Sequence, residues 1–311
     1  MNSPAVSVII PTYNRAQMLC EALASVRRQT VQDFEVLVVD DGSSDDTAAV
    51  AKAFAPQAIY LRQEHGGVAA ARNLGIRSAR ASYIAFLDSD DLWLPHKLER
   101  QLAFLREHPS VGLLYARMWS YHVDRPTERQ LEPRAVARSF DELLNGPNTV
   151  TTSTVIVRRE CFDIVGLFDP SLPTVEDHEL WLRIAHRFPL AFLEEPVAEY
   201  RRHGGGFNAD HAALYEGYRR FYELMLRDHR SRLRNPKAAT RQLAKFEYLC
   251  GTAALKQGER QRALHLISQA LRRDPALGSQ FVTPNISWPA KLWLPIKPYA
   301  AWTASILKAV V

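Results

Sequence analysis

Short, almost continuous apolar runs alternate with segments of helical pattern through the first 90 residues. The runs are VSVII at 6–10, FEVLVV at 34–39, IYL at 59–61 and YIAFL at 83–87. Such runs are typical of strands that are buried on both faces of a sheet. The helical patterns between them cover 15–29, 45–54 and 67–80. This alternation predicts an α/β fold with a central, mostly parallel sheet and helices on both faces.

The pattern is less regular after residue 92. We expect a helix at 94–107, a strand near 111–118, an arginine-rich loop at 122–139, a β-prone segment at 149–158 and an amphipathic helix at 176–188. Residues 210–275 are helical in pattern throughout, and 251–275 looks like one helical hairpin, too short for a repeat array. The sequence therefore predicts an α/β domain at 1–205, a helical extension at 206–280 and a tail at 281–311.

Polar clusters follow three of the predicted strands. They are Pro11-Thr12-Tyr13-Asn14-Arg15, Asp40-Asp41-Gly42-Ser43-Ser44 and Asp88-Ser89-Asp90-Asp91. In open α/β sheets, ligands bind beyond the carboxyl ends of the strands. We therefore expect the three clusters to share one rim of the sheet and to form the functional site there.

The cluster at 88–91 brings three carboxylates within four positions. Like charges this close disfavour each other's ionised form, so a positive group is expected among them. A hard divalent cation such as Mg²⁺ or Mn²⁺ takes oxygen ligands of this kind. The alternative is a set of helix caps before the predicted helix, a role we expect for Asp91. The second acidic pair, Asp40-Asp41, favours a ligand site.

Composition and charge add a second feature. The chain is 47% apolar and 23% charged, as in ordinary globular proteins. Residues 1–200 carry 20 Lys+Arg against 27 Asp+Glu, whereas residues 201–311 carry 19 against 7. Such a basic segment attracts nucleic acid, phosphorylated ligands or acidic lipids, and charge alone does not choose among them. Three widely spaced cysteines and the lack of a signal-peptide pattern indicate a cytoplasmic protein.

Five motifs in order carry a resemblance to a known family. SVIIPTYNR, VVDDGSSDDT, GGVAAARNLG, YIAFLDSDD and EDHELWLR are similar to the motifs of family 2 glycosyltransferases, which have the GT-A fold. The resemblance covers about residues 5–205 and does not extend further. It implies a nucleotide-diphosphate-sugar donor, with a UDP-sugar expected, a divalent cation (Mn²⁺ or Mg²⁺) and inversion at the anomeric carbon.

The resemblance also implies residue roles at the donor pocket. Tyr13 corresponds to the aromatic residue that stacks on the base, and Asp41 to the carboxylate that accepts a hydrogen bond from a base N–H. Asp40 supports the turn, and Arg72 is similar to a residue near the base or the diphosphate. The other residues expected to line this pocket are Pro11, Thr12, Arg15 and Ser89. The alternatives are core packing for Tyr13 and a surface position for Arg72.

The remaining roles concern the metal and the chemistry. Asp88 resembles the residue that contacts the ribose and is also a candidate metal ligand, and Asp90 resembles the direct metal ligand. His203 lies where some GT-A enzymes place a late metal or diphosphate ligand, although an ordinary basic loop explains it equally well. Asp177 matches the catalytic base, with Glu176 in reserve. The alternative is that both acids only favour a helix N-terminus.

The resemblance suggests a hydroxyl acceptor on a polysaccharide or lipid-linked glycan, and no nucleic-acid partner. Trp288, Trp293 and Trp302 with three lysines in the tail suggest peripheral contact with the inner face of the membrane, or packing on the protein itself. Two other classes stay open from the residues: a nucleotidyltransferase of similar core, and a nucleic-acid or membrane adaptor. The first would normally show a glycine-rich phosphate loop near the first strand, which Pro11–Asn14 replaces.

Overall fold

A computed structural model describes residues 3–54, 58–133, 135–145, 149–172, 174–203, 211–228, 233 and 235–277. The chain divides into two compact units, residues 1–209 and 210–311, and each is treated by itself. The sequence-based boundaries at 205 and 280 stay predictions, because both fall outside the described residues. The tail at 281–311, with its predicted membrane contact, lies outside them too.

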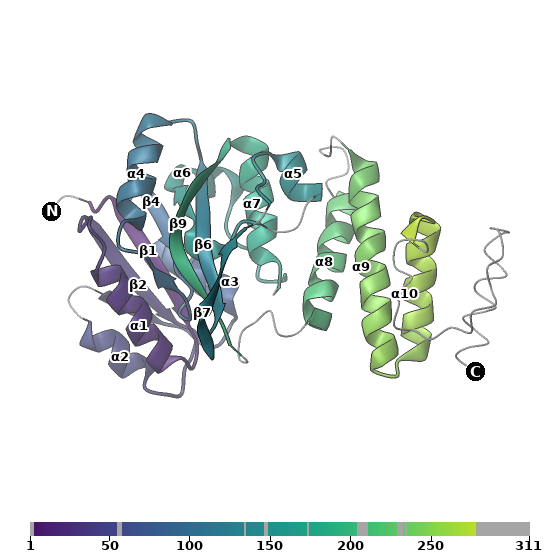
Figure 1. The fold of residues 1–311 in the computed structure, drawn as a ribbon, viewed down its shortest axis with the longest axis horizontal. Coiled ribbons are helices and arrows are strands. Elements are labelled where there is room, and N and C mark those ends of the chain that lie inside the picture. The colour runs from purple at the N-terminus through teal and green to yellow at the C-terminus, as the bar shows by residue number, and fades with distance from the viewer. Residues whose placement is uncertain are drawn as a thin grey trace. The chain divides into compact units, whose positions relative to one another are not determined.

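The first unit is an α/β domain around one sheet (Figure 1). Its strands are β1 (Val6–Thr12), β2 (Phe34–Asp40), β3 (Ala58–Arg62), β4 (Tyr83–Phe86), β5 (Leu92–Trp93), β6 (Leu113–His122), β7 (Arg125–Glu132), β8 (Ile156–Arg158) and β9 (Leu190–Arg202). Its helices are α1 (Ala16–Arg27), α2 (Thr47–Ala53), α3 (Val68–Ser78), α4 (Lys97–Glu107), α5 (Phe140–Asn145), α6 (Arg159–Val165) and α7 (Glu176–Arg187), with the 3-10 turn η1 (Thr152–Thr154).

The sheet order is β3-β2-β1-β4-β8-β6-β9-β5, and β7 pairs with β6. Strands β1 to β4 pair in parallel, as do β6 and β9. Strand β8 is antiparallel to both of its neighbours, β4 and β6. Strands β5 and β7 also pair antiparallel, with β9 and β6. The predicted α/β fold is therefore confirmed, and its sheet is parallel through β1 to β4 and mixed beyond them.

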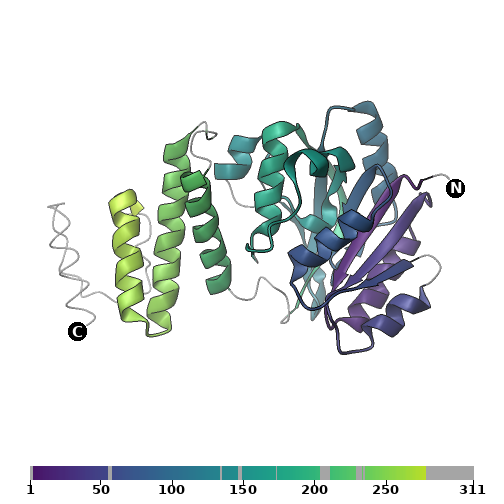
Figure 2. The same ribbon diagram turned by 180° about the vertical axis from the view of Figure 1, so that it is seen from behind.

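Helices cover both faces of this sheet, as the alternation predicted. Helices α1, α2 and α4 pack on the face that presents Val8 and Ile10. Figure 2 shows the opposite face, where α3, α6 and α7 lie. There Phe86 of β4 contacts Phe162 of α6 and Trp181 of α7. Strand residues that point either way are apolar because both faces are covered.

Several elements differ from the sequence prediction. Of the β-prone segment at 149–158, only 156–158 form a strand, and Thr152–Thr154 form the 3-10 turn η1. The short elements β5, α5 and α6 were not predicted. The expected arginine-rich loop at 122–139 contains strand β7, which is exposed along almost its whole length. A strand that buries neither face leaves no apolar alternation to detect. Strand β9 was not predicted either, because Glu194, Glu195 and Pro196 interrupt its apolar pattern. The register against β6 shifts near this point, as at a β-bulge.

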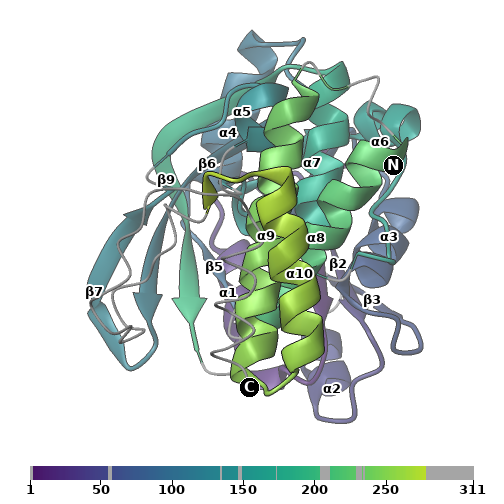
Figure 3. The ribbon, with the colours of Figure 1, turned by 90° about the vertical axis from the view of Figure 1, so that its right-hand side faces the viewer.

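The second unit contains three helices, α8 (His211–Asp228), α9 (Pro236–Lys256) and α10 (Arg260–Arg273). Figure 1 shows α9 between the other two, and Figure 3 shows the same three helices with α10 nearest the viewer. Helices α9 and α10 form the helical hairpin that the sequence pattern predicted. Gly251 lets them approach closely, since a Cβ there would lie 2.6 Å from an Ile267 side-chain atom. No helix in the described part of the chain is long and apolar enough to cross a bilayer.

Candidate active site

The polar clusters lie at adjacent strand ends, as predicted. Strand β1 lies between β2 and β4, and Thr12 at the end of β1 is in register with Asp40 at the end of β2. The backbone N–H of Asp41 donates to the Thr12 carbonyl (2.9 Å), and that of Leu87 to the Ile9 carbonyl (3.0 Å). These bonds extend the ladders past the strands and hold the clusters at one edge of the sheet.

The acidic pair at the end of β2, Asp40 and Asp41, is stabilised mainly by uncharged hydrogen-bond donors. Asp40 is fully buried and accepts bonds from the Ser43 backbone N–H (2.8 Å) and the Tyr60 hydroxyl (2.6 Å). Burial alone would raise the pKa of Asp40, but these bonds reverse the shift and lower it. Asp40 therefore fixes the turn, as the resemblance implied.

Asp41 anchors the segment between β3 and α3. Its carboxylate accepts bonds from the backbone N–H groups of Gly66 (2.8 Å) and Gly67 (2.9 Å) and from the Gln63 side chain (2.7 Å). His65 Nδ1 lies 2.9 Å from the same carboxylate. A carboxylate offers about four acceptor positions, so all are in use. A base N–H would have to replace Gln63 or His65, the two side-chain partners.

His65 was missed by the sequence interpretation. Its ring stacks on Tyr13 with centroids 4.2 Å apart and planes at 28°. Tyr13 is 44% exposed, so it is a surface aromatic and not a core residue. The signal available was the position of His65, beside the Gly66-Gly67 pair at the start of a motif helix. An aromatic and an imidazole here form a platform on which a base can stack.

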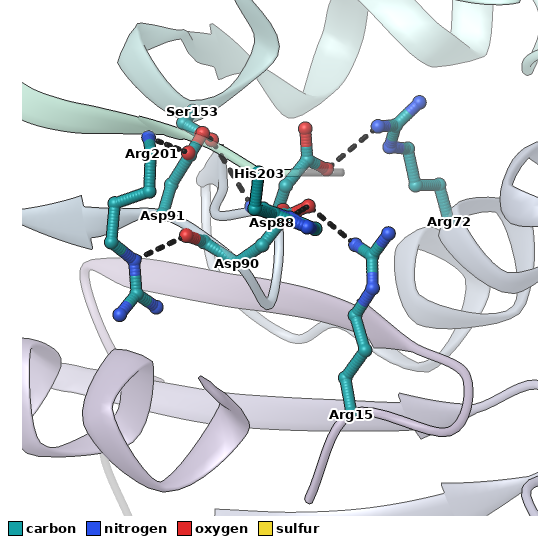
Figure 4. Close-up of polar contacts among 8 residues, drawn as sticks. All are labelled: Arg15, Arg72, Asp88, Asp90, Asp91, Ser153, Arg201 and His203. Atoms are coloured by element: carbon teal, nitrogen blue, oxygen red, sulfur yellow. Dashed lines mark hydrogen bonds and ion pairs between the residues drawn. The ribbon is translucent and has the colours of Figure 1, made fainter. Parts of the chain in front are cut away.

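The three carboxylates after β4 have separate partners. Figure 4 shows the side chains of Arg72 and Arg15 at Asp88 and Asp90, with Arg201 beside Asp90 and Asp91. Asp88 binds Arg72 of α3 (2.7 Å), and Asp90 binds Arg15 (2.5 Å). Asp91 is buried and accepts bonds from the Ser153 hydroxyl (2.6 Å) and the Arg201 backbone N–H (3.2 Å). Burial and the neighbouring carboxylates raise the pKa of Asp91 well above its usual value.

The expected role of Asp91 as a helix cap is wrong. The residue at the N-cap of α4 is His96, and Asp91 instead holds η1 and β9 against the loop. Arg201 also donates to the Asp90 carbonyl (2.5 Å) and pairs with Glu21 of α1. Its neighbour Arg202 donates to Ser120 (2.8 Å) on β6.

Arg72 links the acidic loop after β4 to the first turn of α7. It is buried and donates to Asp88 (2.7 Å) and to Glu176 (2.7 Å) with different nitrogens. A surface position for Arg72 is therefore wrong, and the residue is part of a buried ion-pair bridge. Gly75, one turn later, lets α3 approach β1, because a Cβ there would lie 2.5 Å from an Ile9 methyl carbon. This close approach brings Arg72 to the sheet edge.

Glu176 and Asp177 begin α7 beside this bridge. Asp177 accepts bonds from the Thr152 hydroxyl (3.1 Å) and the His178 backbone N–H (2.6 Å). Burial raises the pKa of Glu176 to about 7, with Asp177 adding to the shift and Arg72 opposing it. Burial also raises the pKa of Asp177, while Arg72 and its two hydrogen bonds oppose this. A carboxyl group whose pKa is raised in this way is suited to proton transfer near neutral pH.

The described residues offer only part of the ligands that a divalent ion needs. Within the described residues, no group of three or more His, Cys, Asp or Glu converges as a metal site. Asp90 Oδ2 and His203 Nε2 lie 3.0 Å apart. Two neighbouring ligands of an octahedral ion, with bonds of about 2.1 Å, are separated by about 3.0 Å. Because Mg²⁺ normally takes few protein ligands and completes its shell with phosphates and water, these two residues fit such an ion.

The other predicted residues lie at the same edge. Pro11, Thr12 and Ser89 are buried, and the Thr12 hydroxyl finds no hydrogen-bond partner in the described part of the chain. A cavity of about 560 Å³ opens beside them. The residues that line it are Tyr13, Asn14, Arg15, Ala16, Gln17, Met18, Asp45 and His203. All the predicted site residues thus belong to the first unit, and their roles stay predictions.

Solved structures with the same fold define the class to which this domain belongs. The Staphylococcus aureus TarS fragment 1–349 in complex with UDP-GlcNAc matches with a TM-score of 0.64 and 21% identity, over 86% of this chain and 81% of that one. The mannosyltransferase PcManGT from Pyrobaculum calidifontis, in complex with GDP-Man and Mn²⁺, matches with a TM-score of 0.58 and 20% identity. That match covers 100% of this chain and 86% of that one. The domain has the GT-A fold.

The sequence comparisons give the family. The chain matches the model described as glycosyl transferase family 2 over residues 7–164, which is half of its length. It is 30% identical over 209 residues to a Rickettsia prowazekii protein named as an uncharacterized glycosyltransferase. The aligned segment spans 65% of each of the two chains. The chain belongs to glycosyl transferase family 2, as the five motifs indicated.

Proposed function

We propose that the protein is an inverting glycosyltransferase that moves a sugar from a UDP-sugar to an acceptor hydroxyl. The observation that carries the proposal is the Arg72 bridge between Asp88 and Glu176. This bridge connects the loop after β4, which is expected to hold the sugar donor, to the first turn of α7, which carries Asp177. The loop expected to hold the donor and the candidate base are therefore held in fixed relative positions, and such positioning favours a direct displacement. Family membership supports the same reaction class.

The donor would bind across the clusters at the sheet edge. The Tyr13–His65 platform offers a surface for the base, and Asp41 lies against His65 as a possible acceptor for a base N–H. Asp88 is half-exposed beside the buried Arg72, where a ribose hydroxyl can reach its free carboxylate oxygen. A Mn²⁺ or Mg²⁺ ion held by Asp90 and His203 would bind the diphosphate and neutralise the charge that grows on it as it leaves.

Asp177 is the proposed general base. The acceptor oxygen forms a bond to the anomeric carbon while the bond from that carbon to the diphosphate oxygen breaks. The acceptor proton passes to Asp177, and a single displacement inverts the configuration. Glu176 is less suited, because Arg72 already occupies one of its carboxylate oxygens at 2.7 Å. The Thr152 hydroxyl and the His178 N–H hold the Asp177 carboxylate in place.

The proposal for the acceptor is supported by the motif resemblance alone. We propose a hydroxyl of a growing polysaccharide or a lipid-linked glycan, and not a nucleic acid. Peripheral attachment to the inner face of a membrane through 281–311 belongs to the same proposal. A thermal-shift panel of nucleotide sugars with Mn²⁺ would identify the donor, because a ligand that binds only the folded protein raises its melting temperature.

The decisive test is Asp177→Asn. Loss of the base should reduce kcat for transfer about 10²- to 10⁴-fold, since general-base catalysis typically contributes that much. The affinity for the UDP-sugar with Mn²⁺, measured by calorimetry, should stay close to that of the wild type. Asp163→Asn is the matched control, because Asp163 is an exposed acid on α6. Equal losses of transfer and of donor binding would remove the base assignment.

A further inference from the structure

A row of three side chains crosses the outer strands of the sheet. Trp119 of β6 is in register with Leu131 of β7 on one side and with Glu199 of β9 on the other. Residues in register on adjacent strands project from the same face of a sheet. The row is about 10 Å long, because neighbouring strands lie about 4.8 Å apart.

The row projects from the face of the sheet on which α7 lies. The sequence neighbours Met118 and Ala198 pack into the core cluster beneath α1 and α4, on the other face. Successive side chains of a strand point to opposite faces, so Trp119 and Glu199 point away from that cluster. Helix α7, with the candidate base Asp177 in its first turn, lies on this second face. The row and the base therefore share one face of the sheet.

The row combines solvent-accessible apolar surface with a carboxylate. Leu131 is 37% exposed, and Trp119 and Glu199 are half-buried. Tryptophan and leucine side by side at a surface leave apolar area in contact with water. Such area beside polar groups is typical of a ligand-binding surface.

Two neighbouring side chains hold the Glu199 carboxylate in position. The Tyr121 hydroxyl donates to one of its oxygens (3.1 Å), and Arg129 Nη1 donates to the other (2.7 Å). The Arg129 guanidinium also lies over the Tyr121 ring, 5.0 Å from its centroid. Each carboxylate oxygen can accept a further bond, so an oriented Glu199 can still bind a hydroxyl of a ligand. We call the five residues Leu131, Trp119, Glu199, Tyr121 and Arg129 the outer-strand surface.

A short series of contacts joins the outer-strand surface to the candidate base. Tyr121 is in register with Arg201, whose backbone N–H donates to the Asp91 carboxylate (3.2 Å). Asp91 also accepts a bond from the hydroxyl of Ser153 (2.6 Å) in η1. The same turn holds Asp177 through the hydroxyl of its first residue. The surface is therefore continuous with the candidate active site and is positioned by the same turn.

We propose that the outer-strand surface is the subsite that binds a glycan acceptor. The inference rests on the proposed function, because it requires that an acceptor hydroxyl reach Asp177. A sugar ring has an apolar C–H face and a rim of hydroxyls. Trp119 and Leu131 match the C–H face, and Glu199 and Arg129 match the hydroxyls. An alkyl chain would use the apolar pair alone, and a polyanion would be repelled by Glu199.

The test separates use of the acceptor from use of the donor. Release of UDP to water, with a UDP-sugar and Mn²⁺, reports donor chemistry without a glycan. Transfer to a panel of short soluble oligosaccharides reports acceptor use. Trp119→Ala should raise the KM for the oligosaccharide about tenfold, in the range expected for loss of an aromatic contact. The kcat at saturating oligosaccharide and the release of UDP to water should stay near those of the wild type, because binding alone is weakened.

Two further variants distinguish a contact with the acceptor from damage to the strand. Trp119→Phe keeps an aromatic ring and should recover most of the affinity for the oligosaccharide. Leu131→Ser changes an exposed residue and should raise the same KM a few-fold, because less apolar area is lost. Ile59→Ser is its matched control, since Ile59 is 39% exposed on β3, at the far edge of the same sheet. This control should behave like the wild type.

The outcomes separate the subsite from the proposed function. An oligosaccharide KM that is unchanged in both Trp119→Ala and Leu131→Ser would overturn the subsite and leave the proposed function intact. A wild-type protein that releases UDP to water but transfers to no oligosaccharide would also overturn the subsite. If the wild type neither binds nor cleaves any UDP-sugar with Mn²⁺, the proposed function itself fails.

Discussion

The two acidic clusters at the sheet edge look alike in the sequence but are stabilised differently in the structure. The pair after β2 is held by main-chain N–H groups, an amide, a hydroxyl and an imidazole. In the trio after β4, the carboxylates of Asp88 and Asp90 pair with the side chains of Arg72 and Arg15, whereas Asp91 accepts bonds from a hydroxyl and a main-chain N–H. One cluster thus fixes a turn, and the other concentrates charge.

The difference shows what makes an acidic cluster suitable for binding a cation. Main-chain donors are fixed by the fold and cannot leave a carboxylate without local unfolding. The function proposed above places a metal ion at Asp90, where the present partner is the side chain of Arg15 and not a main-chain group. Asp41 should therefore matter most for stability, whereas Asp90 should matter most for ligand binding. Mutations can test this contrast directly.

The largest effect is expected for Asp41→Ala. The substitution leaves the N–H groups of Gly66 and Gly67 without their charged acceptor, and hydrogen bonds to charged groups contribute about 1.5–3 kcal/mol each. We expect the free energy of unfolding to fall by about 3 kcal/mol, measured by denaturant titration. Asp46→Ala is the control, because Asp46 is exposed in the same loop and its side chain makes no cap bond. An unchanged denaturation midpoint for Asp41→Ala would contradict the contrast.

Asp90→Ala should give the opposite pattern. Its removal should change the free energy of unfolding by no more than about 1 kcal/mol, because the loss of a partly exposed ion pair is offset by relief of repulsion from Asp88 and Asp91. Donor binding in the presence of Mn²⁺ should weaken about tenfold or more, because the carboxylate proposed to bind the metal directly is lost. Calorimetry with a UDP-sugar checks this, and unchanged affinity in excess Mn²⁺ would refute the metal assignment.

Much of the fold was predictable because its first half follows simple periodicities. The parallel strands are apolar on both faces, and the polar clusters fall where those strands end. The missed strands, β7 and β9, lack this signal. Strand β7 buries neither face, and β9 is interrupted by Glu194, Glu195 and Pro196. Their pairing with β6 is set by tertiary contacts that no local pattern encodes.

The candidate site was predictable only in part. Motif resemblance located the carboxylates, but the groups that neutralise them depend on contacts between residues far apart in sequence. Arg201 lies more than a hundred residues from Asp91, and Glu176 lies equally far from Arg72. Periodicity carries no information about such pairs. The sequence therefore indicated that a positive group was needed at 88–91, but not that the side chains of Arg15 and Arg72 supply it.

The smallest effect is expected for Thr152→Val, which removes one hydrogen bond to Asp177. The surroundings of Asp177 combine both kinds of stabilisation. It accepts bonds from a main-chain N–H and a hydroxyl, and it also feels the charge of Arg72. Thr152→Val removes the hydroxyl while keeping the shape of the side chain. Because the Thr152 bond lowers the pKa of Asp177, its loss should raise that pKa further. A larger fraction of the base is then protonated at any given pH below neutrality.

The sign of the pH effect follows from the need for an ionised base. The acidic limb of the kcat/KM profile for Thr152→Val should move to higher pH, while the rate at high pH stays near that of the wild type. Thr154→Val is the matched control, because this buried threonine of the same turn bonds the Thr151 carbonyl and not a carboxylate. Its profile should not move. If both variants shift equally, the turn itself has been disturbed; if neither shifts, the limb does not report Asp177, and another group takes the acceptor's proton.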